Sequence, residues 1–150
     1  MSIPAITVHQ YWADAIVDGY KDVENRTWRT AYRGPLFIHA GKSKKSMPAS
    51  DRVMRAIAGI PANTDPVLGA IVGIVDLVDI VSDSESLWAE PGELHWLLAN
   101  PRRIEPIYCT GKLNLWQPDP AIVGQVKVLD SLQRVANTDQ SEVCQLDLFA

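Results

Sequence analysis

Cysteine is scarce in this sequence, because Cys109 and Cys144 are the only two among 150 residues and no CxxC spacing occurs. A disulfide framework or a cysteine zinc site is therefore not indicated. Long apolar runs are also missing, since the longest, residues 67–75, ends at Asp76 and falls well short of the roughly 20 residues that cross a bilayer. The N-terminus lacks the basic-then-apolar pattern of a signal peptide. We therefore expect a cytoplasmic protein with no membrane partner.

An overall excess of positive charge is absent too, because the net charge is −4. This balance argues against a general nucleic-acid coat protein. Residues 21–55 nevertheless hold nine lysines and arginines against three acids, which leaves the remainder of the chain at −10. Such segregation predicts one basic face on an acidic body, unless charges adjacent in sequence scatter over the fold.

The three histidines, His9, His39 and His95, have no close-spaced partner. No cluster of histidine, cysteine and acidic residues has metal-ligand spacing, so neither a metal nor a cofactor is indicated. A structural role in the folded core is the simplest interpretation of each histidine.

Apolar periodicity predicts a single domain of short strands and short helices. The expected strands cover residues 3–8, 23–28, 36–40, 67–81 and 93–107, and the expected helices cover residues 11–17 and 51–60. Gly69 and Gly73 inside one strand suggest bends or bulges, and Pro101 interrupts another. This pattern favours an α+β fold built around a small mixed β-barrel with short flanking helices.

Residues 119–150 differ in character from the rest of the chain. Apolar residues three or four apart within residues 119–136 predict a helix, and a polar stretch then leads to a terminal peptide. We therefore divide the chain into a domain at residues 1–118 and an extension at residues 119–150, with the helix and a flexible tail outside the barrel.

Lys21, Glu24, Arg26 and Trp28 form the most informative cluster. Period-two alternation places Glu24, Arg26 and Trp28 on one face of a strand, with Lys21 at its entry. An acid, two cations and a large aromatic surface are suited to holding a planar, polar heterocycle. Spacing alone leaves an equally good alternative, in which Glu24 and Arg26 form a simple ion pair and Trp28 is a core aromatic.

The motifs around this cluster resemble the ASCH domain family, a branch of the PUA-like superfamily. Residues 19–28 read G-x-K-x-x-E-x-R-x-W, residues 10–13 are similar to the preceding Q-P-W-A motif, and residues 38–42 read I-H-A-G-K. Residues 111–116 resemble the family's closing segment, so the resemblance covers roughly residues 3–118. It departs from the family pattern at Tyr11, where proline is common, which puts the start of the first helix in question.

The resemblance implies a small β-barrel with a cleft where the hallmark strand meets the first helix, and it implies binding of RNA or of a nucleoside with a modified base. The residues that it places in or near that cleft are Gln10, Trp12, Lys21, Glu24, Arg26, Trp28, His39 and Lys42.

An enzymatic alternative remains open at this point. Some ASCH relatives are amidohydrolases of acylated cytidine that use a lysine and a threonine three positions further on, and others have been proposed as ribonucleases. Lys21 fits the first position, but Glu24 stands where the threonine would be. If the protein is an enzyme, Lys21 and Glu24 are the expected catalytic residues.

The tail carries a second resemblance. Gln145, Leu146, Asp147, Leu148 and Phe149 are similar to the pentapeptide with which bacterial repair proteins dock on the DNA sliding clamp. The apolar side chains would fill a pocket on the partner from an extended terminal peptide. The alternative is that they pack back on the barrel as a last strand.

Overall fold

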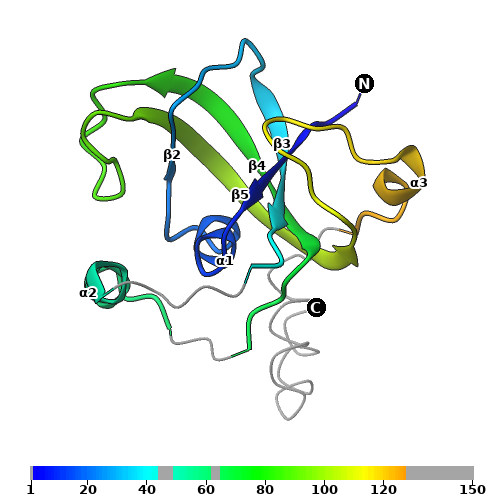
Figure 1. Cartoon of the computed structure of the whole chain (residues 1–150), viewed down its shortest axis with the longest axis horizontal. Coiled ribbons are helices and arrows are strands. Elements are labelled where there is room, and N and C mark those ends of the chain that lie inside the picture. The colour runs from blue at the N-terminus through cyan, green and yellow to red at the C-terminus, as the bar shows by residue number, and fades with distance from the viewer. Residues whose placement is uncertain (1, 44–48, 62–64, 128–150) are drawn as a thin grey trace, which may run out of the picture.

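Five strands form one mixed sheet in the order β1-β3-β4-β5-β2. The computed structural model describes residues 2–43, 49–61 and 65–127. The strands are β1 (Ala5–Val8), β2 (Val23–Arg26), β3 (Gly34–Ala40), β4 (Ala70–Val81) and β5 (Leu94–Tyr108), and the helices are α1 (Trp12–Val17), α2 (Ala49–Ile57) and α3 (Pro120–Val123) (Figure 1). β1 runs parallel to β3, and the other neighbouring pairs are antiparallel.

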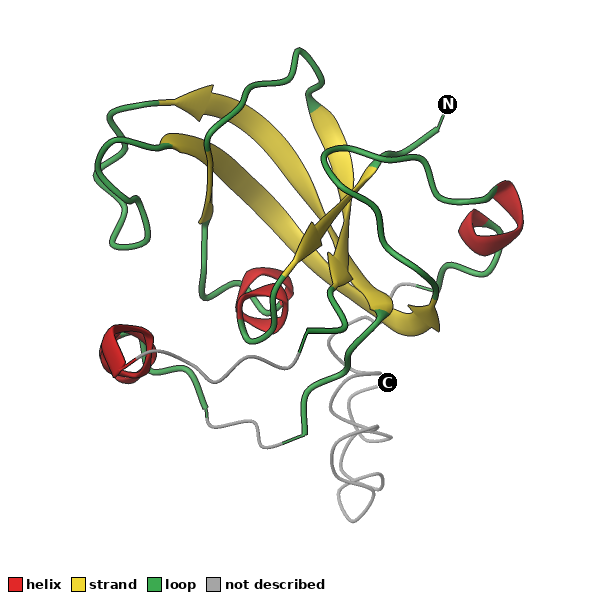
Figure 2. Ribbon diagram, in the orientation of Figure 1, coloured by secondary structure: helices red, strands yellow, loops and turns green. Residues whose placement is uncertain are grey.

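The long strands β4 and β5 curve, so that the sheet forms a half-barrel (Figure 2). This architecture confirms the predicted α+β fold with a small mixed barrel. The Gln10–Tyr11 peptide bond is cis, and α1 begins directly after it at Trp12.

Gly73 lies at one of the register shifts of β4, in agreement with the irregularity that the sequence predicts there. The register of β4 shifts between Ile71 and Gly73 relative to β5. A Cβ atom on Gly73 would lie 2.3 Å from Val17 Cγ1 and 2.8 Å from the Arg102 carbonyl oxygen. The absence of a side chain at this position therefore lets α1 rest directly on the β4 backbone.

The sheet separates two apolar clusters. The first includes Ile16 and Val17 of α1 and the inward residues of the strands around Trp96. The second lies on the other face around Phe37 and Trp116. Strand alternation explains the division, because successive side chains of β3 point to opposite faces.

The start of the C-terminal extension differs from the expectation. Ile122, Val123 and Val126 pack against the second cluster, so residues 119–127 contact the sheet instead of standing outside the barrel. The Asp119 side chain accepts a hydrogen bond of 2.8 Å from the Ala121 N–H and caps α3, which is a single turn. The remainder of the predicted helix and the clamp-binding pentapeptide lie outside the described residues.

Pro101 is accommodated without ending β5. The register between β4 and β5 shifts near this residue, and β2 pairs only with residues 94–97 of β5. Among the strands that the structure describes, none therefore requires the N–H that proline lacks. Within the three described ranges, no helix has the length and apolar character needed to cross a membrane.

Candidate functional site

A cleft of about 670 Å³ opens between the start of α1, the edge strand β2 and the loop after β5. Its volume falls in the usual range for small-molecule sites. The lining residues are Thr7, Val8, His9, Trp12, Glu24, Asn25, Arg26, His39, Gly41, Lys42, Ser43, Thr110, Gly111, Lys112, Leu113 and Asn114.

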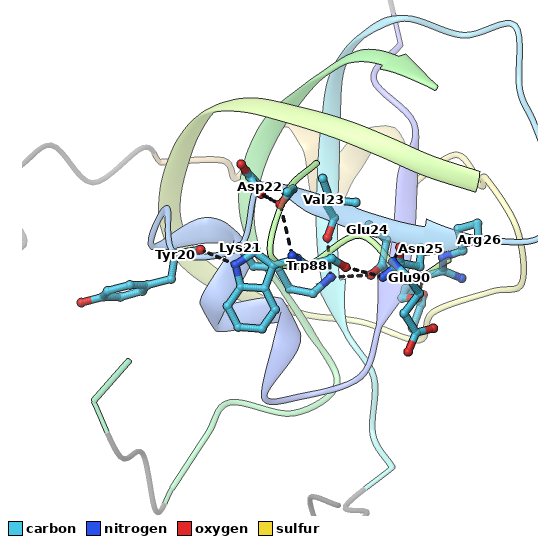
Figure 3. Close-up of polar contacts among 11 residues, drawn as sticks. Tyr20, Lys21, Asp22, Val23, Glu24, Asn25, Arg26, Trp88 and Glu90 are labelled. Carbon is cyan, nitrogen blue, oxygen red and sulfur yellow. Dashed lines mark hydrogen bonds and ion pairs between the residues drawn. The ribbon is translucent and has the colours of Figure 1, made fainter. Parts of the chain in front are cut away.

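Glu24 of β2 lies between two cations, Lys21 just before the strand and Arg26 at its end (Figure 3). Its Oε1 accepts a hydrogen bond from Lys21 Nζ at 3.0 Å, and its Oε2 accepts one from Arg26 at 2.9 Å. Lys21 also donates to the Val23 carbonyl at 2.5 Å and is only 5% exposed. The ion pairs of the simpler interpretation therefore exist, and two of their three members also line the cleft.

These neighbours determine the ionisation of Glu24. Burial by itself would raise the pKa of the Glu24 carboxyl, but the charges of Lys21 and Arg26 and their hydrogen bonds outweigh burial and lower the pKa below its ordinary value of 4.5. Glu24 is therefore an anion at neutral pH.

The lowered pKa of Glu24 gives a prediction for acid stability. A carboxyl whose folded-state pKa lies below its unfolded value stabilises the fold fully above 4.5, and this contribution is lost as the pH falls through the folded-state pKa. We expect urea titrations over a pH series to show a steeper acid loss of unfolding free energy for the wild type than for Glu24→Gln. Parallel pH profiles for the two proteins would contradict this assignment.

Arg26 joins the two edge strands of the half-barrel. The Nη2 group that binds Glu24 also donates to the Thr7 carbonyl of β1 at 2.9 Å. Because β1 and β2 are the outer strands of the sheet, this guanidinium group connects two separate strands that both line the cleft.

His39 is held in the cleft wall by a chain of hydrogen bonds. Trp116 Nε1 donates to Thr7 Oγ1 at 3.2 Å, Thr7 Oγ1 lies 3.3 Å from His39 Nδ1, and His39 Nε2 donates to the Cys109 carbonyl at 2.8 Å. Burial lowers the pKa of His39 and outweighs the hydrogen bond to the Cys109 carbonyl, which raises it, while the charge of Lys42 adds a smaller lowering. A neutral imidazole satisfies every partner, so the geometry supports the structural role expected for this histidine.

Five of the eight ligand-binding candidates come together in the cleft: Trp12, Glu24, Arg26, His39 and Lys42. Lys21 lies behind Glu24 and lines a neighbouring hollow of about 280 Å³ instead.

Gln10 and Trp28 lie elsewhere. Gln10 is buried, donates to the Val67 carbonyl at 2.8 Å and accepts from the Asp14 N–H at 3.1 Å. Trp28 packs on the first apolar cluster, where its ring meets Trp96 edge-on at a centroid distance of 4.8 Å. The strand ends at Arg26, so the alternation that would align Trp28 with the other two residues stops before it.

The described cations of the basic segment do not gather on one face. Arg33 pairs with Asp79 at 3.3 Å, and Arg55 is buried and donates to the Pro61 carbonyl. Lys44 and Lys45 lie outside the described residues. The cleft instead combines Arg26 and Lys42 with Lys112 from a distant part of the chain.

Asn25 is a site residue that the sequence analysis did not single out. Its amide donates to the Trp88 carbonyl at 2.8 Å and accepts from the Glu90 N–H at 2.9 Å, so it holds the loop before β5 against β2 (Figure 3). Trp88 in turn contacts Trp12 edge-on at 5.4 Å between centroids. The position of Asn25 inside the hallmark motif is the sequence feature that could have identified it as a site residue. For Lys112, that feature is its place in the closing motif.

The five-stranded mixed half-barrel with its short helices has the α+β fold of a PUA-like domain. The ASCH domain model matches residues 6–108, and the chain therefore belongs to the ASCH domain family. This family is linked to the binding of RNA and other nucleic acids, which sets the broad class of function as nucleic-acid related.

The curated relatives are much longer proteins. Over 86 residues the chain is 36% identical to human activating signal cointegrator 1 and 34% identical to the mouse protein of the same name. The match covers 53% of this chain and 15% of each relative. The chain thus corresponds to a small part of those proteins.

Solved structures support the fold. The ASCH protein from Zymomonas mobilis superimposes with a TM-score of 0.52 at 18% identity, covering 84% of this chain and 96% of its own. A mutant of the same protein gives a TM-score of 0.53 at 16% identity, covering 85% of this chain and 100% of its own.

Proposed function

We propose that the cleft binds one nucleobase of an RNA strand and recognises it without chemical conversion. The observation that carries this proposal is the composition of the cleft, in which an indole, a fixed carboxylate–guanidinium pair and two lysines from separate segments line one cavity. Planar bases stack on aromatic side chains, and phosphates attract lysine, so this set matches the two chemical parts of a nucleotide.

The base would be recognised through Trp12, Glu24 and Arg26. Each carboxylate oxygen of Glu24 accepts one hydrogen bond, from Lys21 or from Arg26, and keeps a further lone pair for an amine or ring N–H of a base. The carboxylate cannot rotate away freely, because Lys21 and Arg26 hold its two ends. Such a preorganised acceptor favours specific recognition.

The phosphate backbone of the RNA would be held by Lys42 and Lys112, which are exposed at the cleft. Lysine binds phosphate as a point charge and gives salt-dependent, sequence-independent affinity. This arrangement reconciles nucleic-acid binding with the net charge of −4, because a few local cations suffice for a short strand.

Hydrolysis of acylated cytidine is less well supported than binding. A lysine acting as a base must lose its proton, whereas Lys21 donates to the Val23 carbonyl and to an anionic Glu24. Lys21 also lies behind the wall of the larger cleft and does not line it.

Fluorescence anisotropy with a labelled single-stranded RNA tests the proposal. We expect Trp12→Leu to weaken binding about tenfold or more, since base–aromatic stacking contributes about 1–3 kcal/mol. Lys42→Gln and Lys112→Gln should each weaken binding to all sequences and reduce the slope of log affinity against log salt concentration by about one.

Lys127→Gln serves as the matched control, because Lys127 is exposed and lies outside the cleft. Circular dichroism establishes that each variant is folded. Unchanged affinity in all three cleft variants would refute an RNA site here.

A further inference from the structure

Leu113 is 88% exposed at the edge of the cleft. Its neighbours Lys112 and Asn114 are also exposed and line the same cavity. Single exposed leucines are common on protein surfaces, so exposure alone carries no conclusion. What distinguishes Leu113 is the rigid support of its loop.

The loop is anchored on both sides of Leu113. The Cys109 N–H donates to the Gly69 carbonyl at 3.1 Å, and Trp116 exchanges two backbone hydrogen bonds with Ala5 at 2.7 and 3.0 Å. A Cβ atom on Gly111 would lie 2.5 Å from Thr7 Oγ1 and 2.7 Å from the His39 ring. The backbone therefore lies flat on the cleft wall just before the tip.

Asn114 completes the tip with a positive φ of 60°, a conformation that few residues other than glycine and asparagine adopt readily. The chain thus turns sharply directly after Leu113. Together with the anchors, this turn presents the leucine to solvent and keeps its side chain from folding back onto the apolar clusters.

Part of the cleft wall is formed by side chains that are largely buried. Glu24 is 13% exposed and His39 is 1% exposed, although both line the cavity. A base that reaches Glu24 must leave the stack formed with its neighbours in the strand, and this costs free energy. Proteins that open a base stack frequently insert an apolar side chain such as leucine into the gap.

We propose that Leu113 is the wedge that fills the gap left by the bound base. The ligand of the cleft is then a base drawn out of a stacked RNA strand, flanked by phosphates that Lys42 and Lys112 contact. This inference rests on the proposed function, since it assumes that a nucleobase occupies the cleft. It assigns to Leu113 the preference of the cleft for a continuous strand over a free nucleotide.

Two ligands separate the wedge from the base site. The first is a set of free mononucleotides, which need no unstacking. The second is a purine-rich RNA strand with a fluorescent aminopurine at one internal position, whose emission rises when it is unstacked. Both are titrated with the wild type, Leu113→Ala and the conservative variant Leu113→Met.

We expect Leu113→Ala to bind mononucleotides as the wild type does, but to bind the strand about tenfold more weakly and with a smaller rise in aminopurine emission. Leu113→Met, which keeps an apolar side chain of similar volume, should retain most of both signals.

Equal strand affinity and equal emission for Leu113→Ala and the wild type would overturn the wedge while leaving the base site intact. A parallel loss of mononucleotide binding in Leu113→Ala would also overturn it, because the leucine would then be part of the base pocket. If the wild type binds neither the mononucleotides nor the strand, the base site and the wedge are overturned together.

Discussion

Replacing Gly73 with alanine should lower the free energy of unfolding by about 3 kcal/mol, at the upper end of the usual cost of overpacking. The added methyl group would lie 2.3 Å from Val17 Cγ1, 2.7 Å from Val17 Cβ and 2.8 Å from the Arg102 carbonyl. Val17 belongs to α1 and the Arg102 carbonyl to the β5 backbone, so both α1 and β5 would have to move away from β4 to make room. Urea unfolding followed by circular dichroism measures the effect.

Gly124→Ala is the matched control for this experiment. Gly124 has an ordinary φ of −65°, and a Cβ there would find its nearest atoms at 3.7 Å or beyond. We expect a change within about 0.5 kcal/mol. Similar losses of unfolding free energy in Gly73→Ala and Gly124→Ala would show that the close packing at Gly73 does not determine the stability of the fold.

Removing the carboxylate of Glu24 should have the second large effect. Glu24→Gln leaves Lys21, which is 5% exposed, without its anionic partner. Loss of one partner of a buried ion pair typically costs about 3–5 kcal/mol, and we expect a value near the lower limit because glutamine can still accept hydrogen bonds. The same substitution should weaken RNA binding, since Arg26 loses the group that orients it.

A double-mutant cycle isolates the Lys21–Glu24 interaction. Lys21→Met removes the buried cation, so adding Glu24→Gln to it should cost much less than Glu24→Gln alone. Glu105→Gln provides a surface control, because Glu105 is exposed. Additive losses in the double variant would mean that Lys21 and Glu24 are not energetically coupled.

The sequence motifs predicted the contacts among Lys21, Glu24 and Arg26 but not the full set of residues that line the cleft. Lys21, Glu24 and Arg26 are close in the chain, so strand geometry alone predicts that they interact. The same reasoning misplaced Trp28, because alternation holds only within a strand and β2 ends at Arg26. Local patterns contain no information about where a strand stops pairing.

Contacts between distant segments explain the other differences between the predicted site residues and the residues that line the cleft. Lys112 and Leu113 reach the cleft only because Trp116 pairs with Ala5, more than a hundred residues away in the chain. Gln10 carries a family motif, yet its hydrogen bonds to Val67 and Asp14 direct it into the structure. Neither arrangement follows from periodicity, since both depend on which segments meet in three dimensions.

The bridge between Ala5 and Trp116 has a practical consequence for dividing the chain. The family match ends at residue 108, but β1 is an outer strand whose free side is paired in part by Trp116. A fragment cut at residue 108 would leave the backbone N–H and C=O groups of Ala5 unpaired and uncover the apolar surface around Phe37. Exposed strand edges of this kind recruit strands from other molecules. Self-association, and not only lost binding, is therefore the expected behaviour of such a fragment.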